Sequence, residues 1–189
     1  VGINAQHPDT RWAQMPAFDW MERSDRHALA EYVATLPSGA ADHDGAAAAL
    51  FAEYDLILDG TDNFETRYLA NRAAVAAGKP LISGALSQWE GQLSVFDPAR
   101  GGPCYQCIFP EAPVDGLAPS CAEAGVVAPL PGVIGTMMAL ETVKLITGAG
   151  HILRAEMLIY DGLYGESRKI RLTRREGCAA CGGGLRMAD

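Results

Sequence analysis

The sequence predicts an α/β fold, a mixed β-sheet flanked by helices, on three observations. A strand–turn–helix pattern covers residues 54–78, a second short apolar run follows Pro80, and four of the five cysteines form two C-x-x-C pairs. The first two observations indicate parallel strands joined by a crossover helix, because parallel neighbours need a long connection between them. The third indicates a tetracysteine clamp on the same domain.

The strand–turn–helix unit places an acidic turn at the end of a strand. The strand is Leu56–Leu58, an apolar run between polar residues, which is typical of a buried strand in a parallel sheet. The helix covers Phe64–Ala77 and ends at Gly78, a common C-terminal signal. Asp62 and Asn63 therefore lie at the carboxyl end of a strand, where open α/β sheets bind ligands.

Two interpretations of Asp62 remain open from the spacing. Its carboxylate could hold Mg²⁺ beside a nucleotide phosphate, since Mg²⁺ prefers oxygen ligands. Alternatively, Asp62 could simply cap the helix, because Asp is a favoured N-cap residue.

Further elements follow along the chain. The composition predicts helices over 46–51 and 132–147 and strands over 81–85, 91–97, 157–160 and 167–172. Residues 1–50 form an N-terminal segment of uncertain structure, and residues 51–189 form the main domain.

Charge and composition exclude some function classes. The chain has 189 residues, is 49% hydrophobic and carries a formal net charge of −8, which argues against nucleic acid or an anionic membrane as the main partner. A basic run near the C-terminus, made of Arg168, Lys169, Arg171, Arg174 and Arg175, is interpreted as an exposed strand face.

The chain is expected to be cytoplasmic. Its first residues, VGINAQHPDT, lack the basic start and apolar run of a signal peptide. The most apolar region, Val126–Ile146, contains Pro129, Pro131, Glu141 and Lys144, so we do not expect it to span a membrane. In the cytosol, cysteines are more often metal ligands or catalytic groups than disulfides.

The paired cysteines are Cys104 with Cys107 and Cys178 with Cys181. A C-x-x-C turn points both sulfurs at one ion, and two such turns supply the four thiolates of a structural Zn²⁺ site. The pairs are far apart in the sequence, so the site would tie the C-terminal tail to the loop after the third strand. Two disulfides or a redox dithiol are the alternatives.

Cys121 stands apart from these pairs, in a segment that follows several prolines. A thiol in such a loop reacts if its pKa is lowered. A small buried apolar residue is the alternative, which free cysteine often is.

Five segments together resemble the ThiF/MoeB/HesA family, bacterial relatives of ubiquitin-activating enzymes. They are, in order, DLILDGTDNFETRYLAN, GALSQWEGQLSVFDP, GPCYQCIFPE, PSCAEAGVVAPLPGVIGTMMALETVKLITG and GCAACG. The resemblance covers roughly residues 54–182 and implies a Rossmann-like mixed sheet. It implies ATP- and Mg²⁺-dependent adenylation of the C-terminal Gly-Gly carboxylate of a ubiquitin-like sulfur carrier of the ThiS or MoaD type. A persulfide sulfur donor would then complete a thiocarboxylate.

The resemblance also implies roles for single residues. Asp62 matches the family aspartate tied to Mg²⁺ and adenylation, and Asn63, Arg67 and Asn71 match neighbouring supporting positions. Of these, Asp62, Asn63 and Arg67 are expected at the cofactor site, whereas Arg67 and Asn71 could instead sit on the helix surface. Cys121 matches a cysteine that in some members forms a covalent acyl or persulfide link to the carrier tail. Many members carry the tetrathiolate zinc.

The sequence departs from the family in its N-terminal part. No G-x-G-x-x-G follows a strand, and no lysine precedes Lys79. We therefore expect the chain to be the C-terminal portion of an adenylyltransferase that needs the missing portion, as a homodimer or in complex with a chain that carries it. The alternative is a zinc-stabilised module that binds a ubiquitin-like carrier or peptide without ATP chemistry. A zinc-dependent redox or nucleic-acid protein is a third interpretation.

Overall fold

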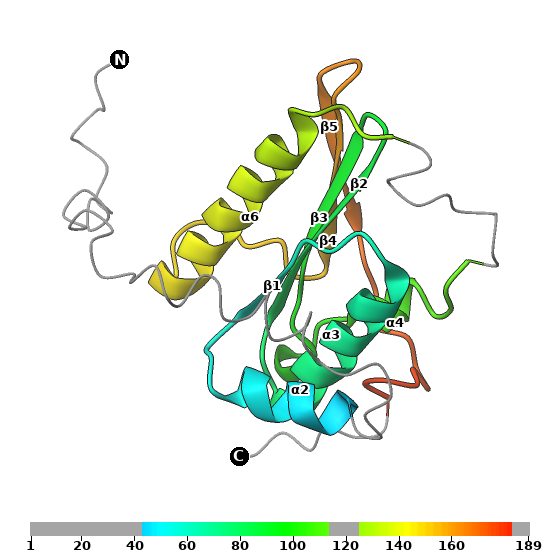
Figure 1. The fold of residues 1–189 in the computed structure, drawn as a ribbon. Helices are drawn as coiled ribbons and strands as arrows, with labels where there is room; N and C mark the ends of the chain where they lie inside the picture. Colours follow the sequence, from blue (N-terminus) through cyan, green and yellow to red (C-terminus); the bar gives the residue numbers. More distant parts are fainter. Residues whose placement is uncertain (1–42, 114–124, 183–189) are drawn as a thin grey trace, which may run out of the picture. The chain divides into compact units, whose positions relative to one another are not determined.

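The computed structural model describes residues 43–113 and 125–182 (Figure 1). In chain order the elements are α2 (His43–Ala52), β1 (Ile57–Asp59), α3 (Phe64–Ala77), β2 (Leu81–Ser87), β3 (Glu90–Phe96), the 3₁₀ helix η2 (Pro98–Arg100), α4 (Tyr105–Ile108), α6 (Leu130–Thr147), β4 (Glu156–Asp161) and β5 (Glu166–Arg171). Each helix and strand expected within these described residues is present, within three residues at either end. The short helix α4 was not expected. The division into segments 1–50 and 51–189 stays a prediction, since residues 1–42 lie outside the described ranges.

The sheet has five strands in the order β1-β2-β3-β4-β5. β1 and β2 are parallel, with Ile57 opposite Leu81, and α3 connects them. The other neighbouring pairs are antiparallel. The predicted mixed sheet with a crossover helix is therefore confirmed.

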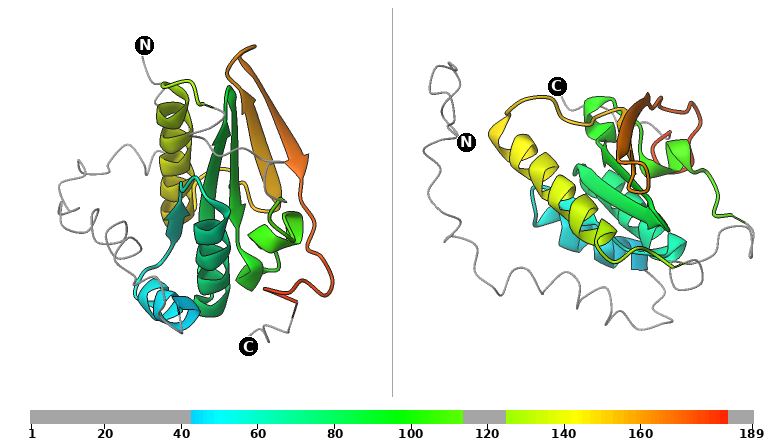
Figure 2. Two further views of the ribbon diagram at one scale, coloured as in Figure 1. Left: turned by 45° about the vertical axis from the view of Figure 1, so that its right-hand side comes forward. Right: turned by 90° about the horizontal axis from the view of Figure 1, so that it is seen from above.

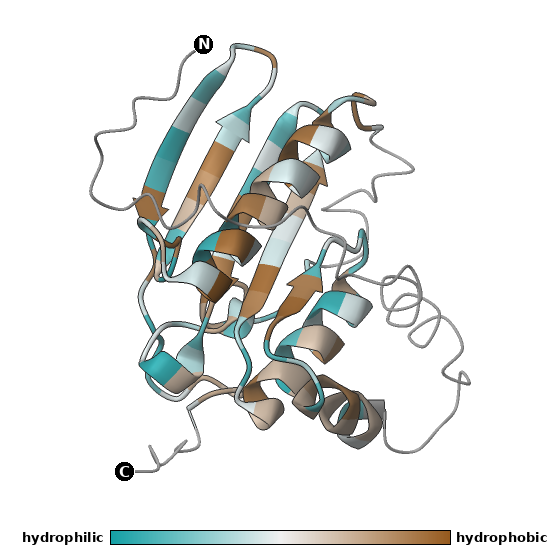
Figure 3. Ribbon diagram, turned by 90° about the vertical axis from the view of Figure 1, so that its left-hand side faces the viewer, coloured by the Kyte–Doolittle hydropathy of each residue, from teal (hydrophilic) through white to brown (hydrophobic). Residues whose placement is uncertain are grey.

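α6 packs against β2 and β3 (Figure 3). Its inner side buries Leu130, Ile134 and Met138 among apolar residues of these strands. Glycines permit the approach: a Cβ added at Gly91 would lie 2.3 Å from Cδ1 of Ile134, and one at Gly84 would lie 2.5 Å from Sδ of Met138. The glycine of the GQLSVFD strand is thus a packing requirement.

Substitution of Gly91 by alanine is expected to destabilise the domain. The new methyl group would push Ile134 and α6 away from the sheet, and overpacking of this kind costs about 1–3 kcal/mol. Urea unfolding measures the loss, and adding Ile134→Val, which removes Cδ1 but keeps Cγ1 at 2.5 Å from the new Cβ, should restore part of it. The control is Gly135→Ala on α6, where no atom crowds the new Cβ and helix propensity improves. Equal stability of Gly91→Ala and wild type would contradict this packing.

α3 contacts β1 and β2 and in turn packs against α2 (Figure 2). The helix ends where predicted, at Gly78, whose φ of 66° is left-handed and suits glycine. α4 lies close to α3, and its Tyr105 ring meets the Phe96 ring edge-on at 5.7 Å. α3 is therefore in contact both with β1 and β2 and with α4, the helix of the first cysteine pair.

β1 differs from the buried strand that the sequence predicted. Ile57 and Asp59 are buried, but the Leu58 side chain between them is 40% exposed. The reason is position, because β1 is an edge strand of the sheet formed by the described residues. Within those residues, only β2 pairs with it.

α6 is long and apolar enough to cross a membrane by length and composition alone, with a mean hydropathy of 1.2. The core helix of a soluble protein can pass the same test, so a single helix of this kind is weak evidence of a membrane span. Its buried Glu141 accepts a hydrogen bond from the Leu153 backbone N–H at 3.0 Å and pairs with Lys144. The bond from Leu153 ties α6 to the segment before β4.

β5 is exposed along its whole length, as the basic run predicted. Arg168, Lys169 and Arg171 belong to this strand, and Arg174 and Arg175 follow it, also exposed.

Candidate functional site

The turn between β1 and α3 presents Asp62 to solvent. Asn63, not Asp62, caps α3: its Oδ1 accepts a hydrogen bond from the Thr66 backbone N–H at 2.8 Å. The interpretation of Asp62 as the cap is therefore wrong. Asp62 is exposed, and its carboxylate forms no hydrogen bond or ion pair with the part of the chain that the structure describes.

A buried polar network holds this turn in place. Asp59, at the end of β1, accepts hydrogen bonds through Oδ1 from the Thr61 backbone N–H at 3.0 Å and from Thr61 Oγ1 at 2.7 Å. Arg67, one turn into α3, donates from Nη2 to the carbonyl oxygens of Thr61 and Gly84. Its Nη1 donates to Ser83 Oγ at 3.3 Å. Arg67 thus joins the turn to the middle of β2, at Ser83 and Gly84.

Arg67 and Asn71 are buried, with exposed fractions of 6% and 1%, so their placement on the helix surface is wrong. The Arg67 donors face protein acceptors, which indicates that this residue shapes the turn. Its predicted contact with a nucleotide stays a prediction. The sequence pattern did not single out Asp59, although its position at the carboxyl end of a strand was the signal that could have found it.

Replacing Arg67 by methionine is expected to cost about 3 kcal/mol of stability, because removal of one partner leaves a buried charge uncompensated. Asp59 Oδ2 lies 3.9 Å from Arg67 Nη1 and has no hydrogen-bond partner among the described residues. Arg72→Met, on the same helix, is the matched control. Arg72 pairs with Asp44 at 2.8 Å in an exposed position, and surface pairs contribute about 1 kcal/mol or less. Chemical unfolding that gives equal losses for both variants would contradict the buried network.

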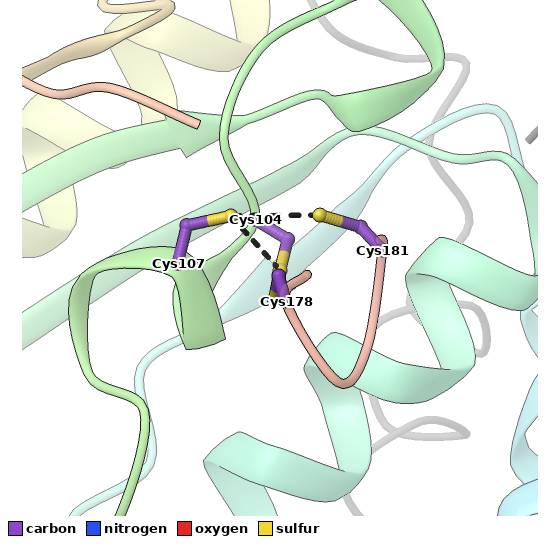
Figure 4. Close-up of side chains that lie close together, drawn as sticks. All are labelled: Cys104, Cys107, Cys178 and Cys181. Atoms are coloured by element: carbon purple, nitrogen blue, oxygen red, sulfur yellow. Dashed lines mark hydrogen bonds between the residues drawn. The ribbon is translucent and has the colours of Figure 1, made fainter. Parts of the chain in front are cut away.

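The four paired cysteines lie close together, as the two C-x-x-C pairs predicted (Figure 4). Cys104 precedes α4, Cys107 lies in it, and Cys178 and Cys181 lie in the loop after β5. All four are buried, and their sulfurs lie within 4.8 Å of one another. Three of the separations are 3.8 Å (Cys104–Cys107), 3.6 Å (Cys104–Cys178) and 3.5 Å (Cys107–Cys181).

These separations fit a tetrahedral metal. Four sulfurs around one ion at the usual Zn–S length of about 2.3 Å lie about 3.8 Å apart. A disulfide needs about 2.05 Å, and the cysteines are free, so the disulfide alternative is wrong. Four protein ligands leave no open position, which is the pattern of a structural and not a catalytic zinc site.

The surroundings of the thiols shift their pKa values in different directions. Burial raises the pKa of Cys104 far above its ordinary value. Burial acts in the same direction on Cys178, but the backbone N–H groups of Cys181 and Ala180 and the neighbouring thiols outweigh it and lower its pKa to about 7. A metal ion supplies the positive charge that buried thiolates require.

The second cysteine turn depends on a glycine. The Gly182 backbone N–H donates to the Cys178 carbonyl oxygen at 2.7 Å, and a Cβ at Gly182 would lie 2.5 Å from that oxygen. Arg174 donates to the Cys181 carbonyl oxygen. These contacts shape the tail around the cluster.

Helix α3 connects the two regions. The exposed turn that contains Asp62 leads directly into its N-terminus. The middle of the helix contacts the first cysteine pair through Asn71, whose amide donates to Cys104 Sγ at 3.8 Å. The Tyr68 hydroxyl donates to the Phe109 carbonyl oxygen at 3.0 Å. Cys121 lies outside the described residues, so its catalytic role stays a prediction.

The fold and the site define an α/β protein with a Rossmann-like mixed sheet and a four-thiol site suited to structural zinc. The sequence model of the ThiF family matches residues 26–180, and the chain belongs to this family.

Proteins of similar sequence support this assignment. A sulfur carrier protein adenylyltransferase of Thermus thermophilus is 48% identical over 133 residues, which are 68% of this chain and 49% of that protein. The adenylyltransferase and sulfurtransferase MOCS3 of Mus musculus is 45% identical over 68% of this chain and 28% of its own length. The chain thus spans half or less of these relatives.

Solved structures of Escherichia coli MccB share the fold. One matches with a TM-score of 0.56 and 14% identity over 72% of this chain and 44% of MccB. MccB with ATP matches with a TM-score of 0.56 and 15% identity, over 71% of this chain and 42% of that chain. At this identity the likeness concerns the fold alone.

Proposed function

We propose that this protein is part of an adenylyltransferase that activates the C-terminal Gly-Gly carboxylate of a ubiquitin-like sulfur carrier with ATP. One observation carries the proposal: in a ThiF-family chain, Asp62 is an exposed carboxylate at the carboxyl end of a parallel strand, with no hydrogen-bond or ion-pair partner among the described residues. The names of the Thermus and mouse relatives support the reaction class.

The reaction requires positioned charge. A carboxylate is a poor electrophile until one of its oxygens becomes a good leaving group, which attack on the α-phosphorus of ATP achieves with release of pyrophosphate. Mg²⁺ would neutralise phosphate charge during this attack. Asp62 would orient the metal, and the Asn63 cap would fix the backbone next to it. Arg67 and Asp59 would keep the turn rigid, so that the carboxylate is positioned before substrates bind.

The remaining parts of the reaction are proposed from the family resemblance. A glycine-rich nucleotide loop would come from a longer chain or from a partner chain, in a homodimer or a heteromeric complex, in the cytoplasm. A persulfide donor would supply sulfur to the acyl-adenylate. Cys121 would form a covalent link to the carrier tail. Zn²⁺ at Cys104, Cys107, Cys178 and Cys181 would hold the tail of the domain.

A second candidate is a zinc-stabilised module that binds a carrier or peptide without ATP chemistry. This candidate needs no glycine-rich loop, and the sequence contains no G-x-G-x-x-G after a strand.

ATP–pyrophosphate exchange by the protein purified from its native source distinguishes the two. The assay is run with a Gly-Gly carrier and with the same carrier lacking its last glycine, and intact mass identifies any co-purifying chain. Exchange that requires the complete carrier supports the adenylyltransferase. Carrier binding with no exchange would overturn it in favour of the binding module.

A further inference from the structure

We propose that Asn71 is a positioning residue of the metal site, whose side-chain amide orients the Cys104 sulfur and couples metal loading to the order of helix α3. This inference goes beyond the proposed adenylation, because it concerns how the cysteine site communicates with the rest of the domain.

The geometry determines which way the Asn71 amide points. The Tyr105 backbone N–H lies 2.9 Å from Asn71 Oδ1, and a backbone N–H can only donate. The oxygen must therefore face Tyr105, which turns the NH₂ group toward Cys104 Sγ at 3.8 Å and Gln106 Oε1 at 3.2 Å. One side chain thus contacts three consecutive residues of the first cysteine turn.

Burial makes these contacts consequential. Asn71 is 1% exposed and Cys104 is fully buried, so water does not replace a lost bond. An N–H group aimed at a sulfur stabilises the thiolate that binds a metal, since hydrogen bonds to a charged form favour that form. Partners of metal ligands hold the ligands in their binding orientation, and losing one commonly costs about 10–100-fold in metal affinity.

Asn71 belongs to a helix with two further contacts to the same region. Val75, one turn later, packs in the core cluster formed by the four cysteines. Tyr68, one turn earlier, bonds the Phe109 carbonyl oxygen just beyond α4. A metal that draws Cys104 and Cys107 into one arrangement therefore also restrains the middle of α3.

Asn71→Asp tests the orienting role. Aspartate keeps the size and the oxygen acceptor for Tyr105 but replaces the N–H donors with a second carboxylate oxygen. With Co²⁺ in place of Zn²⁺, we expect the sulfur-to-cobalt charge-transfer band to shift and zinc transfer to a chelator to accelerate about 10–100-fold. The matched control is Tyr68→Phe, which removes an α3 contact without touching a sulfur, and its cobalt spectrum should equal that of wild type. An unchanged spectrum and unchanged release rate in Asn71→Asp would overturn the proposal.

A second measurement needs no variant and covers the case in which Asn71→Asp fails to fold. Hydrogen exchange of the wild-type protein is compared with and without zinc, with α6 as the internal reference. We expect metal removal to raise exchange in α3 around residues 68–75. Faster exchange confined to residues 104–108 and 173–182 would overturn the coupling. Wild-type protein that takes up neither Zn²⁺ nor Co²⁺ would overturn this proposal. The ATP–pyrophosphate exchange assay would still test adenylation in that case.

Discussion

Cys178→Ala is expected to abolish zinc binding and to release the segment after β5 from the domain. The local core there consists of the four cysteines with Val75, packed against by Ile108 and Ala180, so little apolar surface holds it without a metal. Structural zinc contributes about 10–16 kcal/mol of apparent free energy in small metal-dependent domains. In this protein the separate apolar core between α6 and the sheet does not depend on the cysteines. We therefore expect a smaller loss of unfolding free energy, above about 3 kcal/mol, that mainly affects the segment after β5.

Zinc content, thermal unfolding and proteolysis of the segment 173–182 measure this effect. Ala179→Ser is the matched control, because Ala179 is exposed between the two cysteines of the same turn. Chelation of wild type should reproduce the Cys178→Ala phenotype. Zinc content and melting temperature that stay unchanged in Cys178→Ala would contradict a tetrathiolate site.

Asp62→Asn is expected to remove adenylation while leaving carrier binding and stability intact. The side chain is exposed and forms no hydrogen bond or ion pair with the other described residues, so we expect the substitution to change stability by about 0.5 kcal/mol or less. A neutral amide binds Mg²⁺ more weakly than a carboxylate does. A bound metal stabilises charge in the transition state by several kcal/mol, so its loss should slow adenylation by about 100-fold or more.

Steady-state adenylation by the complete protein, together with carrier affinity and melting temperature, checks this prediction. Glu65→Gln in the first turn of α3 is the control, since it removes an exposed carboxylate three residues after Asp62. Its activity should stay within about threefold of wild type, a difference of under 1 kcal/mol. Wild-type adenylation by Asp62→Asn would exclude Asp62 from the reaction.

The elements that the sequence predicted well are those with local signals. Gly78 ends α3 where its left-handed conformation is required, and Gly148 ends α6 in the same way. Each C-x-x-C turn is likewise a local feature of four residues, and the sequence predicted that the two turns would meet, as they do in the structure. In these cases a few adjacent residues contain the whole physical reason.

Burial of Arg67 and Asn71 could not be predicted in this way. Their acceptors and donors come from β2 and from the first cysteine turn, and only the folded chain brings those partners beside α3. A helix with two polar residues four apart looks like a solvated face. The choice between Asp62 and Asn63 as the cap also depended on backbone geometry, since both residue types favour that position.

Mass spectrometry of the carrier protein tests the central claim most directly. The carrier is incubated with the natively purified protein, ATP and Mg²⁺, and its C-terminal peptide is analysed before sulfur is supplied. The account predicts an AMP adduct on the terminal glycine carboxylate, absent when Asp62→Asn replaces the wild-type chain. A carrier that binds the protein but stays unmodified would contradict adenylation and identify the domain as a binding module.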